Sequence, residues 1–121
     1  GLDLTLRDVQ TELKKRGLPW EEAKAFPNSA VIGDWVPIKH FSSFLETPFE
    51  LRVNGELRQA SVGHEMRRTP EQLLKVADGL FNLRDGDIFF TGTPKGVGPI
   101  HPGDSLELKW ADRLQYTVQF S

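Results

Sequence analysis

Residues 49–62, FELRVNGELRQASV, carry the strongest fold signal in this 121-residue chain. Asn54-Gly55 lies between two segments of alternating apolar and polar residues, and this dipeptide favours the tight turn of a two-stranded hairpin. A two-residue loop places Leu57 opposite Arg52, whereas Leu51 and Val53 face the other side of the sheet. The apolar residues of the two strands therefore do not all fall on one face. The sequence therefore predicts the turn and leaves the register of the two strands open.

A helix is predicted before the hairpin, near the start of the chain. Thr5 followed by Asp8 resembles a capping box, with Asp in place of the usual Glu or Gln. An apolar stripe follows at helical spacing, formed by Leu6, Val9 and Leu13. A neighbouring polar stripe has the same spacing and consists of Arg7, Gln10 and Lys14. Gly17 and Pro19 are expected to end this helix.

A second helix is predicted after the hairpin. Thr69, Pro70 and Gln72 supply an N-cap, a proline at the first helical position and the partner of a capping box. The expected buried stripe is Leu73, Val76, Ala77 and Leu80. Further strands are predicted at residues 30–32, 87–91, 105–110 and 114–120. The expected fold class is therefore a β-rich α+β domain with two short helices.

Composition excludes several classes of function. The chain has no Cys, so disulfides, thiolate metal sites and Cys nucleophiles are excluded. The net charge of -2 argues against nucleic acid as the main partner. The longest apolar runs are too short to cross a membrane, so no membrane association is expected. These properties fit a cytoplasmic protein, which is the expected location.

Two segments carry candidate chemistry, and each has a structural alternative. Gly92 and Thr93 lie in FFTGTPKGVGP (residues 89–99), where backbone N–H groups and hydroxyls at a strand end could hold a small anion. A purely structural Gly-Pro loop explains the same residues. Lys24 lies in PWEEAKAF (residues 19–26) and is either a surface ion-pair partner or a cation that reaches an acidic ligand.

Five motifs in the same order resemble the fumarylacetoacetate hydrolase family. They are LDLTLRDVQ (2–10), KKRGLPWEEAKAF (14–26), VNGELRQ (53–59), GDIFFTGTPKGVGP (86–99) and the PGD turn (102–104). The resemblance implies a mixed β-sandwich roll of the type found in the C-terminal domain of this family. It also implies that residues 1–121 are the C-terminal part of a single catalytic domain whose upstream segment is missing.

The resemblance assigns roles to six residues. Asp3 matches the third carboxylate of a site for Mg²⁺, or for Mn²⁺ or Ca²⁺, whose other two carboxylates come from an upstream Glu-x-Glu that this chain lacks. Lys24 and Gln10 match catalytic positions. The positions expected to bind substrate are Thr93, Gly92 and Arg7. One departure is Ala30-Val31, where many members of the family have Cys-Pro.

The implied activity is Mg²⁺-dependent C–C bond hydrolysis of acylpyruvates, of the fumarylpyruvate or acetylpyruvate type, or decarboxylation of oxaloacetate. The expected partners are a small 2-oxo acid and a second copy in a homodimer, and the fragment alone is expected to be inactive. One alternative is a 2-hydroxyhepta-2,4-diene-1,7-dioate isomerase or decarboxylase of aromatic-acid catabolism. Another is a non-catalytic domain that binds small anions. An upstream Glu-x-Glu and a lid with a His/Glu pair would favour an enzyme.

Overall fold

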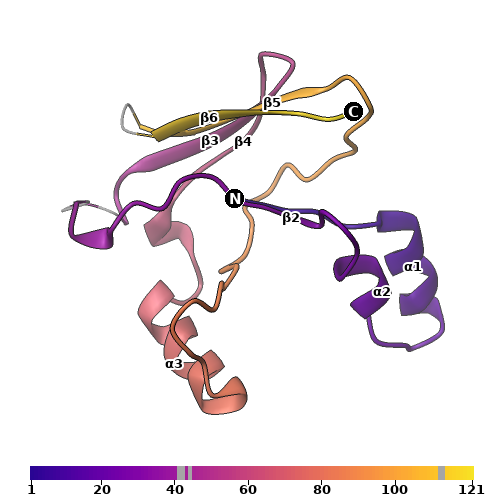
Figure 1. Ribbon diagram of the computed structural model, residues 1–121, viewed down its shortest axis with the longest axis horizontal. Coiled ribbons are helices and arrows are strands. Elements are labelled where there is room, and N and C mark those ends of the chain that lie inside the picture. Colours follow the sequence, from indigo (N-terminus) through magenta and orange to yellow (C-terminus); the bar gives the residue numbers. More distant parts are fainter. Residues whose placement is uncertain (41–42, 44, 112–113) are drawn as a thin grey trace. The chain divides into compact units, whose positions relative to one another are not determined.

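The computed structural model describes residues 1–40, 43, 45–111 and 114–121 (Figure 1). The chain forms two compact units, Gly1–Trp35 and Val36–Ser121. None of the helices in the described ranges is long and apolar enough to cross a membrane. The two units are described in turn.

The first unit contains two short strands and two helices. Its elements are β1 (Leu2–Asp3), α1 (Arg7–Lys15), α2 (Glu21–Lys24) and β2 (Ala30–Val31). β1 pairs with β2 in an antiparallel two-stranded sheet, which confirms the strand expected near residue 30. The four-residue helix α2 was not predicted from the sequence.

The start of α1 differs from the prediction. The N-cap is Leu6 and makes no side-chain capping hydrogen bond, so the capping box expected from Thr5 and Asp8 is wrong. Thr5 lies one residue too early to cap the helix, and its hydroxyl accepts a hydrogen bond from Lys24 instead. Thr5 therefore binds a lysine of α2 and does not cap α1.

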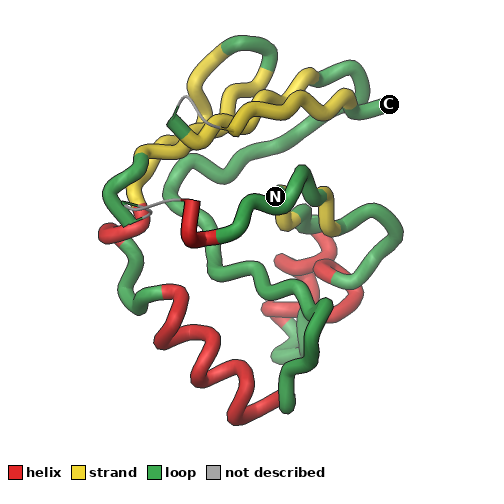
Figure 2. The backbone as a smooth tube through the Cα atoms, turned by 60° about the vertical axis from the view of Figure 1, so that its left-hand side comes forward, coloured by secondary structure: helices red, strands yellow, loops and turns green. Residues whose placement is uncertain are grey.

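The second unit is built on a four-stranded antiparallel sheet with the strand order β4-β3-β5-β6. Its strands are the long yellow segments of Figure 2. Its elements are η1 (Ile38–His40), β3 (Pro48–Val53), β4 (Glu56–Val62), η2 (Gly63–Glu65), α3 (Pro70–Phe81), β5 (Ser105–Trp110) and β6 (Leu114–Gln119). The hairpin and the last two predicted strands are confirmed.

A β-bulge settles the register that the sequence left open. The turn has φ 53° at Asn54 and φ 84° at Gly55, as a two-residue hairpin requires. Leu57 pairs with Arg52 as expected, but the next pair is Leu51 with Gln59. Arg58 is therefore an additional residue in β4. The bulge returns Gln59 to the face of the sheet on which Leu51 lies.

The two faces of the sheet have different chemistry. One face is apolar and includes Val53 and Leu106, which are 6% and 0% exposed, and the rings of Phe49 and Trp110, whose centroids are 5.7 Å apart. The other face carries a charged ladder, which consists of Glu50, Arg52, Glu107 and Lys109. Burial of the apolar face provides the main hydrophobic stabilisation of this unit.

The strand predicted at residues 87–91 does not form within the described part of the chain. Its segment follows a turn in which Asp87 accepts a hydrogen bond from the backbone N–H of Arg84, as the LRDGD sequence favours. Apolar and β-branched residues favour a strand, but a strand also needs a partner for its backbone groups. No ladder of the described residues includes this segment, so the prediction of a strand here is wrong.

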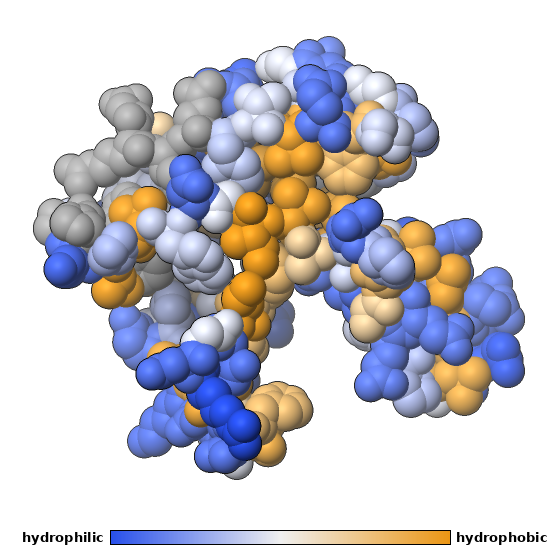
Figure 3. Space-filling model, viewed as in Figure 1, coloured by the Kyte–Doolittle hydropathy of each residue, from blue (hydrophilic) through white to orange (hydrophobic). Residues whose placement is uncertain are grey.

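Helix α3 begins as predicted but buries less than predicted. Thr69 and Gln72 form both hydrogen bonds of the capping box. Ala77 is buried, whereas Val76 and Leu80 are 49% and 71% exposed, so only part of the expected stripe is covered. Other apolar side chains of this unit are also exposed, among them Ile88, Phe89 and Val97. Figure 3 shows apolar residues, in orange, on the outer surface of the molecule.

Candidate functional site

Lys24 and Asp3 form the central ion pair of the first unit. The Lys24 Nζ lies 2.6 Å from Asp3 Oδ1. The same ammonium donates to the Leu4 carbonyl at 3.1 Å and to the Thr5 hydroxyl at 2.8 Å. A lysine ammonium has three N–H donors, so three oxygens of one short segment meet its full donor capacity.

Backbone hydrogen bonds fix both partners of this ion pair. Asp3 pairs with Ala30 across the two-stranded sheet, and the Leu4 N–H donates to the Ser29 carbonyl at 2.8 Å. The N–H of the N-cap residue of α1 donates to the Ala23 carbonyl at 3.0 Å, and Ala23 is 0% exposed. Because Ala23 directly precedes Lys24, its burial anchors the base of the lysine side chain.

Partial exposure leaves the pair accessible to a ligand. The side chains of Lys24 and Asp3 are 32% and 44% exposed. By contrast, the Lys15–Glu12 pair on α1 has an N–O distance of 3.7 Å and side chains that are 70% and 61% exposed. The sequence left two interpretations of Lys24 open. The structure shows an ion pair, and its acidic partner is the carboxylate to which the family resemblance assigns a metal.

Arg7 and Gln10 form a second polar pair on α1. Arg7 Nη1 donates to Gln10 Oε1 at 2.7 Å, and Gln10 is only 6% exposed. Lys14, the third member of the predicted polar stripe, lies over the Trp20 ring at 4.7 Å from its centroid. The stripe is therefore not a uniform solvated face, since Gln10 is buried and hydrogen-bonded and Lys14 makes a cation–π contact.

Asp3 is the candidate ligand for a divalent cation in the first unit. Asp3 is partly exposed and offers carboxylate oxygens, the ligand type that Mg²⁺ prefers. In the described ranges, no group of three or more His, Cys, Asp or Glu side chains is arranged to hold a metal ion. Hard cations need several oxygen ligands, so Asp3 fits one position of a metal site and requires further ligands to complete it.

Gly92 and Thr93 lie in the second unit, in the loop that precedes β5. Gly92 has φ 119°, in the left-handed region that favours glycine. The Thr93 Oγ1 accepts a hydrogen bond from Gln59 Nε2 at 2.9 Å, and the same nitrogen donates to the Pro94 carbonyl at 2.9 Å. Arg58 Nη1 donates further along the loop to the Pro99 carbonyl at 3.3 Å.

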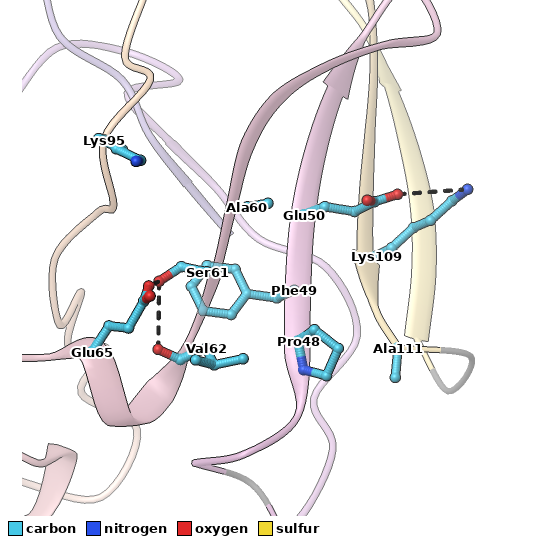
Figure 4. Close-up of a pocket in the computed structure, with 10 residues that line it drawn as sticks. All are labelled: Pro48, Phe49, Glu50, Ala60, Ser61, Val62, Glu65, Lys95, Lys109 and Ala111. Atoms are coloured by element: carbon cyan, nitrogen blue, oxygen red, sulfur yellow. Dashed lines mark hydrogen bonds and ion pairs between the residues drawn. The ribbon is translucent and has the colours of Figure 1, made fainter.

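A concavity of about 650 Å³ lies elsewhere in the second unit, on strands β3, β4 and β5 (Figure 4). Its lining includes Glu65, which accepts a hydrogen bond from Ser61 that lowers the pKa of the Glu65 carboxyl. It also includes Lys109, which lies 3.0 Å from Glu107 and 4.0 Å from Glu50. The charged side chains of the lining are Glu50, Glu65, Lys95 and Lys109, and none of the predicted site residues lines the concavity.

Sequence reasoning gave Thr5 and Gln59 no part in the site, although the side chain of each hydrogen-bonds to a predicted site residue. Thr5 was interpreted as a helix cap, and Gln59 was part of a hairpin with an open register. The motif LDLTLRDVQ places Thr5 two residues after Asp3, and this spacing could have suggested a shared role. The contact of Gln59 depends on the β-bulge, for which the residue pattern gave only the mismatch of faces as a signal.

Comparisons with known proteins agree with these motifs. The family described as fumarylacetoacetate (FAA) hydrolase C-terminal matches residues 1–119. An oxaloacetate tautomerase of Escherichia coli is 45% identical over 107 residues, which cover 88% of this chain and 49% of that protein. The chain thus spans about half the length of the curated relatives it matches.

Solved structures show the same fold. A fumarylacetoacetate hydrolase family protein from Yersinia pestis matches with a TM-score of 0.93 and 38% identity, over 98% of this chain and 56% of that one. A fumarylpyruvate hydrolase from Pseudomonas aeruginosa, in complex with Mn²⁺ and pyruvate, matches with a TM-score of 0.90 and 33% identity, over 98% of this chain and 51% of that one. The β-rich α+β fold expected from the sequence is confirmed.

Proposed function

Since the chain belongs to the fumarylacetoacetate hydrolase family, we propose that the whole protein is a metal-dependent enzyme that acts on small 2-oxo acids. The leading activity is tautomerisation of oxaloacetate, the reaction named for the relative from Escherichia coli. The observation that carries the proposal is the Lys24 ammonium, which the Leu4 carbonyl and the Thr5 hydroxyl hold beside the Asp3 carboxylate.

Lys24 is proposed to stabilise negative charge on the substrate. In keto–enol exchange a proton leaves C3 of the 2-oxo acid, negative charge develops on the C2 oxygen, and a proton then reaches that oxygen. A fixed ammonium close to the C2 oxygen lowers the energy of the charged form, because its position is set before the reaction begins. The hydrogen bonds to Leu4 and Thr5 and the ion pair with Asp3 hold Lys24 in place. Because these contacts use all three N–H donors, Lys24 would act on a nearby substrate oxygen as a fixed positive charge.

Asp3 is proposed as one ligand of a divalent cation, with Mg²⁺ as the first candidate and Mn²⁺ or Ca²⁺ as alternatives. When bound, such a cation supplies Lewis-acid polarisation of the carboxylate and ketone oxygens of a 2-oxo acid. The fumarylpyruvate hydrolase structure holds Mn²⁺ and pyruvate, which supports a divalent cation for this chain as well. Asp3 would also limit the positive charge around Lys24.

The other predicted site residues have supporting roles in this proposal. Gln10 is proposed to place a water molecule or substrate oxygen, and Arg7 to keep the Gln10 amide in position through their 2.7 Å hydrogen bond. Thr93 and the backbone N–H of Gly92 are proposed to bind the substrate carboxylate. Each of these roles can be tested by a single substitution in the whole protein.

C–C bond hydrolysis of an acylpyruvate is the second candidate, because one of the matched structures is a fumarylpyruvate hydrolase. Hydrolysis and oxaloacetate decarboxylation would both leave a 2-oxo acid enolate, so Lys24 would have the same charge-stabilising role. We also propose a homodimer as the assembly, which sedimentation velocity on the whole protein tests.

A substrate panel tests the proposed function. The whole protein is assayed with oxaloacetate for keto–enol exchange and CO₂ release, and with fumarylpyruvate and acetylpyruvate for C–C cleavage. Each assay is repeated after chelation of divalent cations and again after Mg²⁺ or Mn²⁺ is restored. We expect cation-dependent turnover of oxaloacetate, with tautomerisation the fastest reaction. Binding of oxaloacetate without turnover of any substrate would favour the non-catalytic anion-binding alternative.

A further inference from the structure

Gln59 donates hydrogen bonds to the Thr93 loop through its amide nitrogen. Gln59 Nε2 lies 2.9 Å from Thr93 Oγ1, 2.9 Å from the Pro94 carbonyl and 3.5 Å from the Lys95 carbonyl. Backbone carbonyl oxygens only accept hydrogen bonds, so the donor side of the Gln59 amide must face them. This surrounding fixes the orientation of the amide.

The orientation of the amide determines the direction of the Thr93 hydroxyl. A hydroxyl has one hydrogen to donate and two lone pairs. Since the –NH₂ group of Gln59 can only donate, Thr93 Oγ1 is the acceptor of their hydrogen bond. The hydrogen of Thr93 is then directed away from Gln59. Because Thr93 is exposed, that hydrogen is available to a ligand outside the loop.

The β-bulge makes this contact possible. Arg58 is the additional residue of β4, and the pairing beyond it sets Gln59 opposite Leu51. Arg58 holds the same loop through the Pro99 carbonyl, and its backbone carbonyl lies so close to Gly96 that a side chain there would clash. The bulge thus presents two neighbouring side chains to the loop, of which only Gln59 contacts the Thr93 hydroxyl.

We propose that Gln59 is a positioning residue, which orients the Thr93 hydroxyl as a hydrogen-bond donor to the carboxylate of the substrate. The proposal rests on the proposed function of Thr93 as a carboxylate-binding residue. A hydroxyl that already donates within the protein must break that bond to bind an anion, whereas one that only accepts is prepared to donate. Gln59 acts through Thr93 and contacts no substrate itself.

A double-mutant cycle on the whole protein tests this proposal. The affinity for oxalate, a planar mimic of the pyruvate enolate, is measured by isothermal titration for Gln59→Met, Thr93→Val and the double variant. Arg58→Met is the matched control, because Arg58 also holds the loop but does not contact Thr93. Melting temperatures are measured for all variants. Gln59→Asn, which keeps an amide but is one methylene shorter, replaces Gln59→Met where that variant does not fold.

The proposal predicts coupling between the two residues. Thr93→Val should weaken oxalate binding by about tenfold or more, as expected for loss of a charge-assisted hydrogen bond. Gln59→Met should weaken it by about fivefold in the presence of Thr93 and by less than about twofold in the Thr93→Val background. Arg58→Met should lower the melting temperature and leave oxalate affinity unchanged.

Two results would overturn the proposal, and they differ. If Thr93→Val weakens oxalate binding but Gln59→Met does not, or if the two losses multiply, Gln59 does not act through Thr93 and the proposed role of Thr93 stands. If Thr93→Val leaves oxalate affinity unchanged, the proposed role of Thr93 fails, and the role of Gln59 fails with it.

Discussion

Thr5 and Thr69 show how the same residue type can serve two purposes in one chain. Both are followed three residues later by a side chain suited to a capping box, but only Thr69 caps a helix. Thr5 precedes the N-cap residue Leu6, so its hydroxyl is directed to Lys24. The local sequence predicted a capping box at both Thr5 and Thr69. The Thr5 hydroxyl instead bonds to Lys24, which is 19 residues away in the sequence, and local patterns do not reveal such a contact.

Gly96 gives a prediction at the scale of a single residue. It has φ 101°, and a Cβ at this position would clash with the Arg58 carbonyl. We expect Gly96→Ala to lower the free energy of unfolding by about 2–4 kcal/mol, because backbone strain and a steric clash add. Urea unfolding measures this effect. Gly103→Ala is the control, since Gly103 has φ 95° with open space around it and should cost about 1–2 kcal/mol. Equal losses of unfolding free energy for Gly96→Ala and Gly103→Ala would contradict the close approach of the Arg58 carbonyl to Gly96.

At the scale of elements, helix α3 tests the capping box. Thr69 accepts from the Gln72 N–H at 3.3 Å, and the Gln72 side chain accepts from the Thr69 N–H at 3.0 Å. Thr69→Ala should lower the free energy of unfolding by about 1 kcal/mol. Thr69→Ser keeps the capping hydroxyl and should therefore retain most of the stability of the wild type. Chemical denaturation of both variants checks this. A loss as large for Thr69→Ser as for Thr69→Ala would show that the hydroxyl is not the stabilising group.

The charged ladder of the sheet predicts a dependence of stability on pH. Hydrogen bonding from Arg52, together with the charges of Arg52 and Lys109, lowers the pKa of Glu50 below its ordinary value of 4.5. The folded state therefore binds fewer protons than the unfolded state in this range. The stabilisation is present above the ordinary pKa and is lost as the pH falls through the lowered pKa.

Glu50→Gln should therefore flatten the loss of stability between about pH 5 and pH 3. Denaturant unfolding at several pH values measures the slope. Some slope should remain in the variant, because the pKa of Asp104 is also lowered, by hydrogen bonds from the His101 N–H and from Asn54. An identical slope in both proteins would mean that the ion pair of Glu50 and Arg52 does not persist in solution.

The strands and loops were predictable to different degrees. Asn54-Gly55 and the alternation around it predicted the hairpin, because turn chemistry and strand periodicity are local properties. The bulge was not predicted, since it depends on which residues of two strands become partners. The segment at residues 87–91 has strand composition but no partner in the described sheets. Local preference predicted the potential for a strand, and pairing decided the outcome.

For the molecule as a whole, the candidate site was predicted mainly through ordered motifs rather than residue patterns. Composition and periodicity described a β-rich domain and left Lys24 and Thr93 with two interpretations each. The family resemblance selected Asp3 and Lys24, and the structure places them 2.6 Å apart. A single motif could not predict this ion pair, because Asp3 lies in β1 and Lys24 in α2. Their contact depends on how α1, which lies between them in the chain, folds back.

The proposed metal site gives a prediction for the whole chain. Since Asp3 is the one metal ligand proposed within residues 1–121, this segment alone should bind Mg²⁺ weakly or not measurably. The whole protein should bind it tightly enough for titration. Isothermal titration of both proteins at one ionic strength compares the affinities, with Asp3→Asn in the whole protein as the control. Equal and tight binding by residues 1–121 would mean that the metal site lies elsewhere.

The central claim is that Lys24 stabilises charge on a 2-oxo acid, and a comparison of two lysine variants tests it most directly. In the whole protein, kcat/KM for oxaloacetate is measured for Lys24→Ala and for Lys15→Ala, which removes the exposed ion pair with Glu12. We predict a loss of about 10²-fold or more for Lys24→Ala, as expected for a preorganised charge, and no change for Lys15→Ala. Circular dichroism confirms that both variants fold. A folded Lys24→Ala variant with kcat/KM near that of the wild type would contradict the account.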